Sequence, residues 1–142
     1  GCNSHLDFDL DLARDQSDKN PVFYLQYAHA RICNILSRSE QMGLSFNSYD
    51  TSLLSHEDEF NLVKLMMDFK EVSEKACKNL EPQNIANYLQ DLSSLFHKFY
   101  NHCRVITEDE ALTKSRLALI KSVKIILHNG LTLLGISAPE RM

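Results

Sequence analysis

Two tyrosines and an arginine at helical spacing are the residues of this sequence best suited to contact a nucleic acid. Tyr24, Tyr27 and Arg31 stand at positions i, i+3 and i+7, so on a helix they lie on one side. Phenol rings stack on nucleobases, and a guanidinium group stacks on a base or pairs with a phosphate. The spacing is therefore compatible with an RNA-binding face. By itself it favours a half-buried tyrosine pair with an arginine at its rim, because tyrosine is commonly half-buried in ordinary cores.

Two histidine–cysteine pairs suggest other chemistry. His29 and Cys33 stand four residues apart, as metal ligands on a helix can, but no second pair lies near them in the sequence. We interpret them as a packed histidine and a free thiol. His102 beside Cys103 could supply a base and a nucleophile, yet adjacent helical side chains point about 100° apart. We therefore expect no metal site and no catalytic residue in this chain.

Residues 1–19 are predicted to be a connector to a missing domain. Asp7, Asp9 and Asp11 alternate with apolar residues, which is a strand-like period. A divalent-cation site is disfavoured, because the turning glycine of a calcium loop is absent. We expect an amphipathic segment whose apolar side rested on that missing domain.

The tyrosine face requires a helix, predicted over residues 21–37. Asn20 is a good N-cap, and Pro21 suits the first helical position, where its missing N–H costs nothing. The core stripe of this helix is predicted to be Leu25, Ile32 and Leu36. Residues 39–54 are rich in Ser, Asn, Gly and Asp, which predicts a loop tethered by Phe46 and Tyr49.

A second helical region is predicted to begin at Ser55, with Asp58 as the acid of a capping box. Its apolar pattern changes phase near Phe69-Lys70, so we expect a break there. The predicted buried positions before and after the break are Phe60, Val63, Met67, Val72, Ala76 and Leu80.

Two longer helices complete the chain. One begins at Pro82, and its core positions are predicted to be Ile85, Leu89, Leu92, Phe96, Phe99 and Cys103. Thr107 and Glu110 form a second predicted capping box. The last apolar stripe passes through Gly130 and comprises Ile120, Val123, Leu127, Leu131 and Leu134. Gly135 should end that helix, with residues 136–142 as a tail. Arg116 could pair with a buried carboxylate or face RNA, and we expect the pairing. The whole predicts an all-α bundle of about five helices.

Composition narrows the class of protein. A length of 142 residues suits one domain. The net charge of −4 argues against a general nucleic-acid binder, but residues 1–20 carry −3 and residues 111–142 carry +4, which fits a local RNA-facing surface. The four cysteines form no C-x-x-C pair, and no signal peptide or membrane-spanning run is visible. We expect a cytoplasmic protein with free thiols that does not bind a membrane.

Three stretches carry a resemblance to a known family. Residues 20–31 read NPVFYLQYAHAR, which resembles the helix that opens the anticodon-binding domain of bacterial-type class I arginyl-tRNA synthetases, a domain of the DALR type. Residues 5–13 and 133–142 resemble the segment joining that domain to the catalytic body and the ending of the same family. The resemblance therefore covers nearly the whole chain, and it implies residues 20–142 as the anticodon-binding bundle.

The resemblance also implies which residues bind RNA. Transferred position by position, the family's contacts with the anticodon stem-loop fall on Tyr24, Tyr27, Arg31, Tyr100 and Met142. Some relatives carry an aromatic residue where this chain has Arg104, whose guanidinium can stack or pair with phosphate instead.

The parent enzyme implied by the resemblance attaches arginine to its tRNA with ATP and magnesium. This chain has no motif like His-Ile-Gly-His or Lys-Met-Ser-Lys-Ser and no Gly-rich phosphate loop, so we expect it to bind arginine tRNA without cofactor or catalysis. Two alternatives stay open. One is a helical protein-interaction module that uses the Tyr24/Tyr27 face, and the other is a small hydrolase built on His102 and Cys103.

Overall fold

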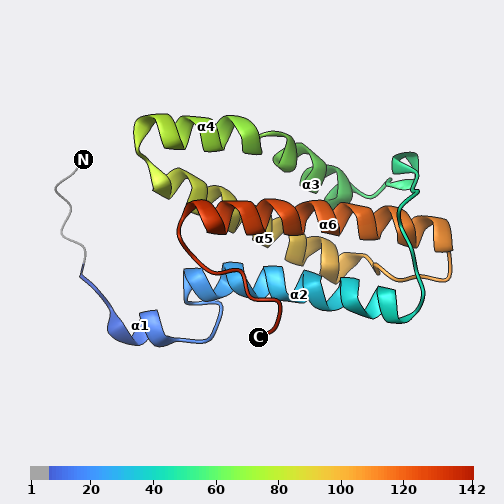
Figure 1. The fold of residues 1–142 in the computed structure, drawn as a ribbon, viewed down its shortest axis with the longest axis horizontal. Coiled ribbons are helices and arrows are strands. Elements are labelled where there is room, and N and C mark those ends of the chain that lie inside the picture. Colours follow the sequence, from blue (N-terminus) through green and yellow to red (C-terminus); the bar gives the residue numbers. More distant parts are fainter. Residues whose placement is uncertain (1–6) are drawn as a thin grey trace.

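The computed structural model describes residues 7–142, and within that range it contains helices and no strand. The elements are α1 (Leu10–Arg14), α2 (Pro21–Gln41), the 3₁₀ turn η1 (Thr51–Leu53), α3 (Glu57–Met67), α4 (Phe69–Asn79), α5 (Pro82–His102) and α6 (Glu110–Leu133). Helices α2 to α6 pack lengthwise into one bundle, and α1 lies to one side of it (Figure 1). The predicted all-α bundle of about five helices is confirmed.

Helix α5 is the centre of the bundle because it contacts α2, α3, α4 and α6. All six core positions predicted for it are buried, and four of them expose none of their surface: Leu89, Leu92, Phe96 and Phe99. Burying a large apolar side chain contributes roughly 1.5–3 kcal/mol. The long apolar stripe of this helix therefore determines where the other helices pack.

Helix α2 begins as predicted but ends later. The side chain of Asn20 accepts hydrogen bonds from the backbone N–H groups of Val22 and Phe23, and Pro21 occupies the first turn. The predicted end at residue 37 was wrong, since α2 continues to Gln41. Ser39 is accommodated inside the helix because its buried hydroxyl donates to the carbonyl of Leu36.

The prediction of a strand-like segment near the start of the chain was wrong. Asp9 caps α1 by accepting hydrogen bonds from the N–H groups of Asp11 and Leu12. A capped turn satisfies backbone donors that an isolated strand would leave to solvent. Leu12 and Phe8 are exposed in this structure, and residues 1–6 lie outside the described range.

The predictions for α3 need two corrections. His56, not Ser55, is the N-cap, and Glu59 is the acid of its capping box. The predicted stripe of Phe60, Val63 and Met67 is exposed, at 49%, 36% and 77%. The opposite side, with Asp58, Glu59 and Leu62, faces the core instead.

The break after α3 is confirmed at Asp68, which ends α3 and begins α4. Two side chains that were predicted to pack are exposed, one at the end of α4 and one in the loop between α2 and η1. Leu80 is 87% exposed and holds the left-handed turn that ends α4, at φ 56°. Tyr49 is 53% exposed, whereas Phe46 packs against the core and beneath Lys121.

Helix α6 begins at a different cap from the predicted one and ends as predicted. Asp109, not Thr107, caps it by accepting from the N–H of Leu112. At the other end, Gly135 adopts φ 71°. Its N–H donates to the carbonyl of Thr132, and the N–H of Ile136 donates to the carbonyl of Leu131. These two bonds form a Schellman motif, which turns the chain away from the helix.

The described helices include none that is both long enough and apolar enough to span a bilayer.

Gly130 lies inside α6 because it allows α6 and α5 to approach closely. A Cβ at this position would lie 2.5 Å and 2.7 Å from the two Cδ atoms of buried Leu89. Helix propensity alone predicts that Gly130→Ala stabilises the protein by about 1 kcal/mol. We expect the overpacking to dominate and to lower the free energy of unfolding by about 1–3 kcal/mol. Urea denaturation measures this.

The exposed neighbour Asn129 provides the control, since Asn129→Ala should leave stability unchanged or slightly raised. Combining Gly130→Ala with Leu89→Val should restore part of the lost stability. A Gly130→Ala variant more stable than the parent would show that Leu89 yields freely.

Candidate nucleic-acid interface

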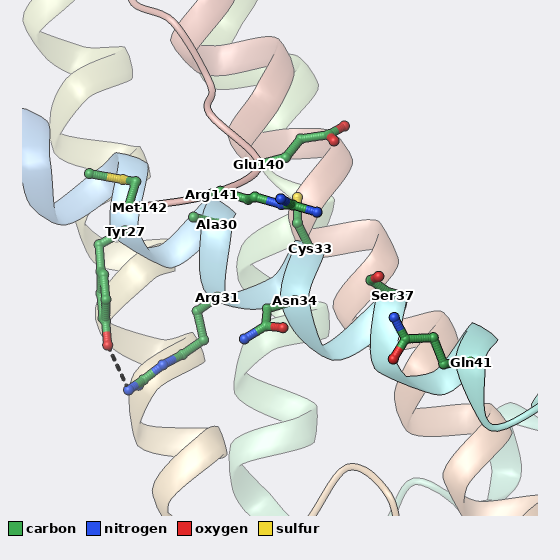
Figure 2. A pocket seen from close by; sticks show the side chains of 10 residues that line it. All are labelled: Tyr27, Ala30, Arg31, Cys33, Asn34, Ser37, Gln41, Glu140, Arg141 and Met142. Carbon is green, nitrogen blue, oxygen red and sulfur yellow. Dashed lines mark hydrogen bonds between the residues drawn. The ribbon is translucent and has the colours of Figure 1, made fainter.

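The guanidinium group of Arg31 is held between two tyrosine rings. Its carbon lies 5.0 Å from the ring centre of Tyr27 and 4.4 Å from that of Tyr100. One terminal nitrogen donates to the hydroxyl of Tyr27 at 2.9 Å, a bond that Figure 2 shows. Arg31 and Tyr27 belong to α2 and Tyr100 to α5, so the stack joins two helices. Cation–π contacts and the hydrogen bond together fix the orientation of the arginine.

His97 is part of this stack and was not identified from the sequence. The second terminal nitrogen of Arg31 donates to its Nδ1 at 3.3 Å, so Nε2 carries the proton. The ring lies 5.2 Å from the ring of Tyr24 and 6.0 Å from that of Tyr27. The spacing of His97 and Tyr100, three residues apart on one helix, was the available signal.

Burial and the charge of Arg31 lower the pKa of His97 to about 4. The imidazole is therefore neutral near pH 7 and can accept the hydrogen bond from Arg31. A cationic ring at this position would repel the guanidinium group. The stack consequently carries a single positive charge, which resides on Arg31.

Tyr24 and Tyr27 differ in exposure. The ring of Tyr27 is 37% exposed, whereas Tyr24 is half-buried, packs against the core and has its hydroxyl 3.3 Å from Oγ of Ser94. Both rings line a hollow of about 450 Å³ together with Phe23, Arg31 and His97. The half-buried position predicted as the alternative is confirmed for Tyr24, and its contact with RNA stays a prediction.

Tyr100 and Arg104 line a second hollow, of about 440 Å³, at the end of α5. Tyr100 is 40% exposed, and the Arg104 side chain is exposed too. Arg38 of α2 reaches the same hollow. The arrangement places an open aromatic ring beside two cationic side chains.

Met142 lies in a groove of about 610 Å³ that it shares with Tyr27, Arg31 and Arg141. Figure 2 shows its side chain beside the ring of Tyr27. The six residues predicted from the sequence and from the resemblance thus line three hollows. Tyr27 and Arg31 line two of them, and the contact of Arg31 with Tyr100 connects these to the third. That these residues contact RNA stays a prediction.

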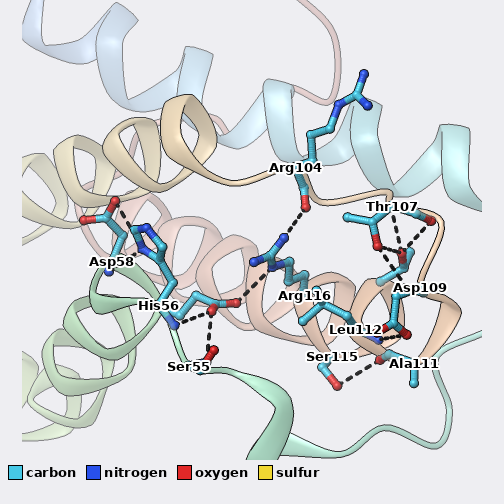
Figure 3. A network of polar contacts seen from close by, with 12 residues as sticks. Ser55, His56, Asp58, Arg104, Thr107, Asp109, Ala111, Leu112, Ser115 and Arg116 are labelled. Carbon is cyan, nitrogen blue, oxygen red and sulfur yellow. Dashed lines mark hydrogen bonds and ion pairs between the residues drawn. The ribbon is translucent and has the colours of Figure 1, made fainter.

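A buried ion pair between α3 and α6 also holds the backbone at Arg104, directly after α5. Oε2 of Glu59, whose side chain is fully buried, lies 3.0 Å from Nε of Arg116. Its Oε1 accepts from the backbone N–H groups of Ser55 and His56 at 3.1 Å and 2.8 Å. Arg116 also donates to the carbonyl of Arg104 at 2.7 Å (Figure 3). The predicted pairing of Arg116 with a buried carboxylate is confirmed.

Asp58 makes a second set of contacts between α3 and α5. Its carboxylate, 3% exposed, lies 2.6 Å from Nδ1 of His102 and 3.5 Å from the ammonium group of Lys98. The hydrogen bond from His102 holds the pKa of Asp58 below its usual range. Cys103 is buried, and burial raises the pKa of its thiol. His102 is thus engaged with Asp58, and Cys103 lacks the exposure and acidity of a nucleophile.

His29 and Cys33 are both buried side by side, as a packed histidine and a free thiol. Nδ1 of His29 lies 3.7 Å from Sγ of Cys33 and 3.0 Å from the carbonyl oxygen of Pro139. Burial lowers the pKa of His29, and the nearby Lys124 lowers it further against the opposing effect of the bond to Pro139. The buried His29 ring therefore contacts the backbone of the last segment of the chain, at Pro139.

The sequence of this chain matches the model of a known domain family. The profile of the DALR anticodon binding domain matches residues 25–142, which is most of the chain. The chain therefore belongs to the DALR anticodon-binding domain family.

The similar proteins are arginine–tRNA ligases. The chain is 47% identical to the one from Salinibacter ruber and 48% identical to the one from Desulforamulus reducens, covering 99% of this chain in both cases. It spans about a quarter of the length of these curated relatives.

Two solved structures are similar as well. A protein from Campylobacter jejuni described as an arginyl-tRNA synthetase superposes with a TM-score of 0.84 at 30% identity, over all of this chain and 31% of that one. The Thermus thermophilus arginyl-tRNA synthetase has a TM-score of 0.74 at 35% identity, over 84% of this chain and 21% of that one.

Replacing Arg116 tests the buried pair. Arg116→Ala leaves the Glu59 carboxylate buried without its counter-charge, so we expect the free energy of unfolding to fall by about 3–5 kcal/mol. Urea denaturation measures the loss. The control is Lys75→Ala, which removes a closer but exposed pair, 2.6 Å from Glu71, and should change the midpoint little. Equal effects of the two substitutions would contradict the role given to burial.

The titration of His97 tests the Arg31 stack. Its Cε1–H resonance should titrate near pH 4, well below the usual 6.5. Because the folded pKa is the lower one, the neutral ring contributes stability that is complete above pH 6.5 and is lost as the pH falls towards 4. Arg31→Met should raise the pKa of His97 but leave it depressed, since burial is the larger cause. A midpoint near 6.5 in the parent chain would contradict the stack.

Proposed function

We propose that this chain is the domain of an arginine–tRNA ligase that binds the anticodon stem-loop of arginine tRNA. The observation that carries the proposal is the stack of Tyr27, Arg31 and Tyr100, which presents two aromatic rings at the surface, 37% and 40% exposed. Sequence-specific proteins recognise unpaired RNA bases by stacking them on aromatic and guanidinium planes. Family membership and the similar ligases support the same assignment.

The charges around the stack suit an anionic ligand despite the net charge of −4. Arg38 and Arg104 border the hollow beside Tyr100, and Arg141 borders the groove beside Tyr27. Glu140 is the acidic residue that lines this groove. Arginines next to exposed rings allow bases to stack while phosphates are neutralised. We propose that Tyr24, Tyr27, Arg31, Tyr100, Arg104 and Met142 contact the RNA.

The chemistry belongs to another part of the proposed enzyme. The complete ligase would attach arginine to its tRNA in the cytoplasm with ATP and magnesium, on a catalytic domain that joins this chain through residues 1–19. Residues 20–142 would supply binding energy for the tRNA. Binding energy from parts of a substrate remote from the reacting atoms can lower the barrier of the chemical step.

Replacing Tyr27 tests the proposal. Because base–aromatic stacking contributes about 1–3 kcal/mol per base, Tyr27→Ala should weaken binding of an arginine tRNA anticodon stem-loop by that amount in a filter-binding assay. Tyr49→Ala is the matched control, since that ring is 53% exposed and lines a separate hollow. Circular dichroism should show unchanged helix content for both variants.

Salt dependence separates this proposal from a protein-interaction module on the Tyr24/Tyr27 face. RNA affinity should fall steeply and linearly on a log–log scale as salt is raised. A parent chain that binds the stem-loop no more tightly than an unrelated hairpin, and without salt dependence, would favour the protein-interaction module.

A further inference from the structure

The last segment of the chain, residues 136–142, returns along α2 after leaving α6 (Figure 1). The Schellman motif at Gly135 starts this reversal. Ile136 and Ala138 then pack against the core. These contacts account for the beginning of the segment, and they end before the residues that line the groove.

Two side chains of α2 hold the backbone of the middle of this segment. Nε2 of Gln26 donates to the carbonyl oxygen of Ser137 at 3.0 Å and lies 3.1 Å from its hydroxyl. Nδ1 of His29 lies 3.0 Å from the carbonyl oxygen of Pro139. A carbonyl can only accept, so His29 must carry its proton on Nδ1. Gln26 and His29 are three residues apart and hence share one side of α2.

These bonds lie immediately before the residues that reach the stack. Glu140, Arg141 and Met142 line the groove formed with Tyr27 and Arg31, and Figure 2 shows the chain crossing α2 towards Tyr27. Backbone that is ordered before a ligand arrives does not lose that conformational freedom on binding. Contacts that order residues 137–139 therefore lower the cost of using residues 140–142 for binding.

We propose that Gln26 and His29 are positioning residues for RNA binding, which act by fixing the segment that carries Arg141 and Met142 against the Tyr27–Arg31 stack. This inference rests on the proposed function. Neither side chain has to touch the RNA: Gln26 and His29 are bonded to the 136–142 segment, and His29 is 1% exposed. The role requires a donor at each position.

Four variants test the inference, and three of them are single substitutions. Gln26→Met and His29→Leu keep comparable side-chain volumes without a donor. His29→Asn restores an N–H near the position of Nδ1. A shortened chain that ends at Pro139 removes the residues through which both positions are proposed to act.

Binding of the arginine tRNA anticodon stem-loop is measured for each variant, together with hydrogen exchange of residues 137–142 and the melting temperature. Gln26→Met and His29→Leu should weaken binding by about three- to tenfold, the effect of one lost hydrogen bond. Exchange in the segment should quicken, and the melting temperature should change little for Gln26→Met. His29→Asn should bind more tightly than His29→Leu.

The shortened chain separates a positioning role from a general structural one. It should bind at least as weakly as Gln26→Met, since it also lacks Arg141 and Met142. Adding Gln26→Met to it should cause no further loss, because the effects of residues that act through one element are not additive. Additive losses, or unchanged binding by Gln26→Met and His29→Leu, would overturn the inference. If Tyr27→Ala still weakens binding in that case, the proposed function stands. A parent chain that does not bind the stem-loop overturns the proposed function and this inference together.

Discussion

The buried pair of Glu59 and Arg116 is the interaction on which the geometry of the interface depends. It joins the start of α3 to the first half of α6 and, through the carbonyl of Arg104, to the end of α5. Glu59 is fully buried and bonded on both oxygens, so each group compensates the desolvation of the other. The pair therefore holds the loop that carries Arg104 beside the exposed ring of Tyr100.

Helix α5 serves the core and the interface with different sides. Phe96 and Phe99 expose no surface and join the bundle, while His97 and Tyr100, on the side towards α2, contact Arg31. In the proposed function, the rigid core beneath the stack would limit the rearrangement needed for a base to bind. The same packing lowers the pKa of His97, so the neutral ring that Arg31 needs is a consequence of the position of α5.

The segment at residues 136–142 is held differently from the helices. Its early residues are packed, but its later ones line a groove and are exposed. Gln26 and His29 are part of the same helix as Tyr27 and Arg31, so one helix both contributes to the stack and holds the segment that lies against it. Within these few residues, one side of α2 contacts the 136–142 segment and another forms the stack.

The amino-acid sequence by itself determined the features that depend on local chemistry or on a long apolar period. The cap at Asn20, the core stripe of α5 and the stop at Gly135 follow from propensity and spacing, and the structure confirms each. The resemblance of residues 20–31 indicated the family. These signals need only neighbouring residues, which is why they could be identified without a structure.

Tertiary structure alone decided which side of α3 is buried and which residues complete the interface. Apolar periodicity favoured Phe60, Val63 and Met67, yet Glu59 faces the core because it pairs there with Arg116. The two residues are 57 positions apart in the sequence, so the pairing could not be identified from neighbouring residues. His97 joins the stack through Arg31, at a separation of 66 residues, and His29 holds Pro139 across 110. A buried polar residue looks like a surface residue in a sequence, since the partner that compensates its desolvation is brought to it only by folding.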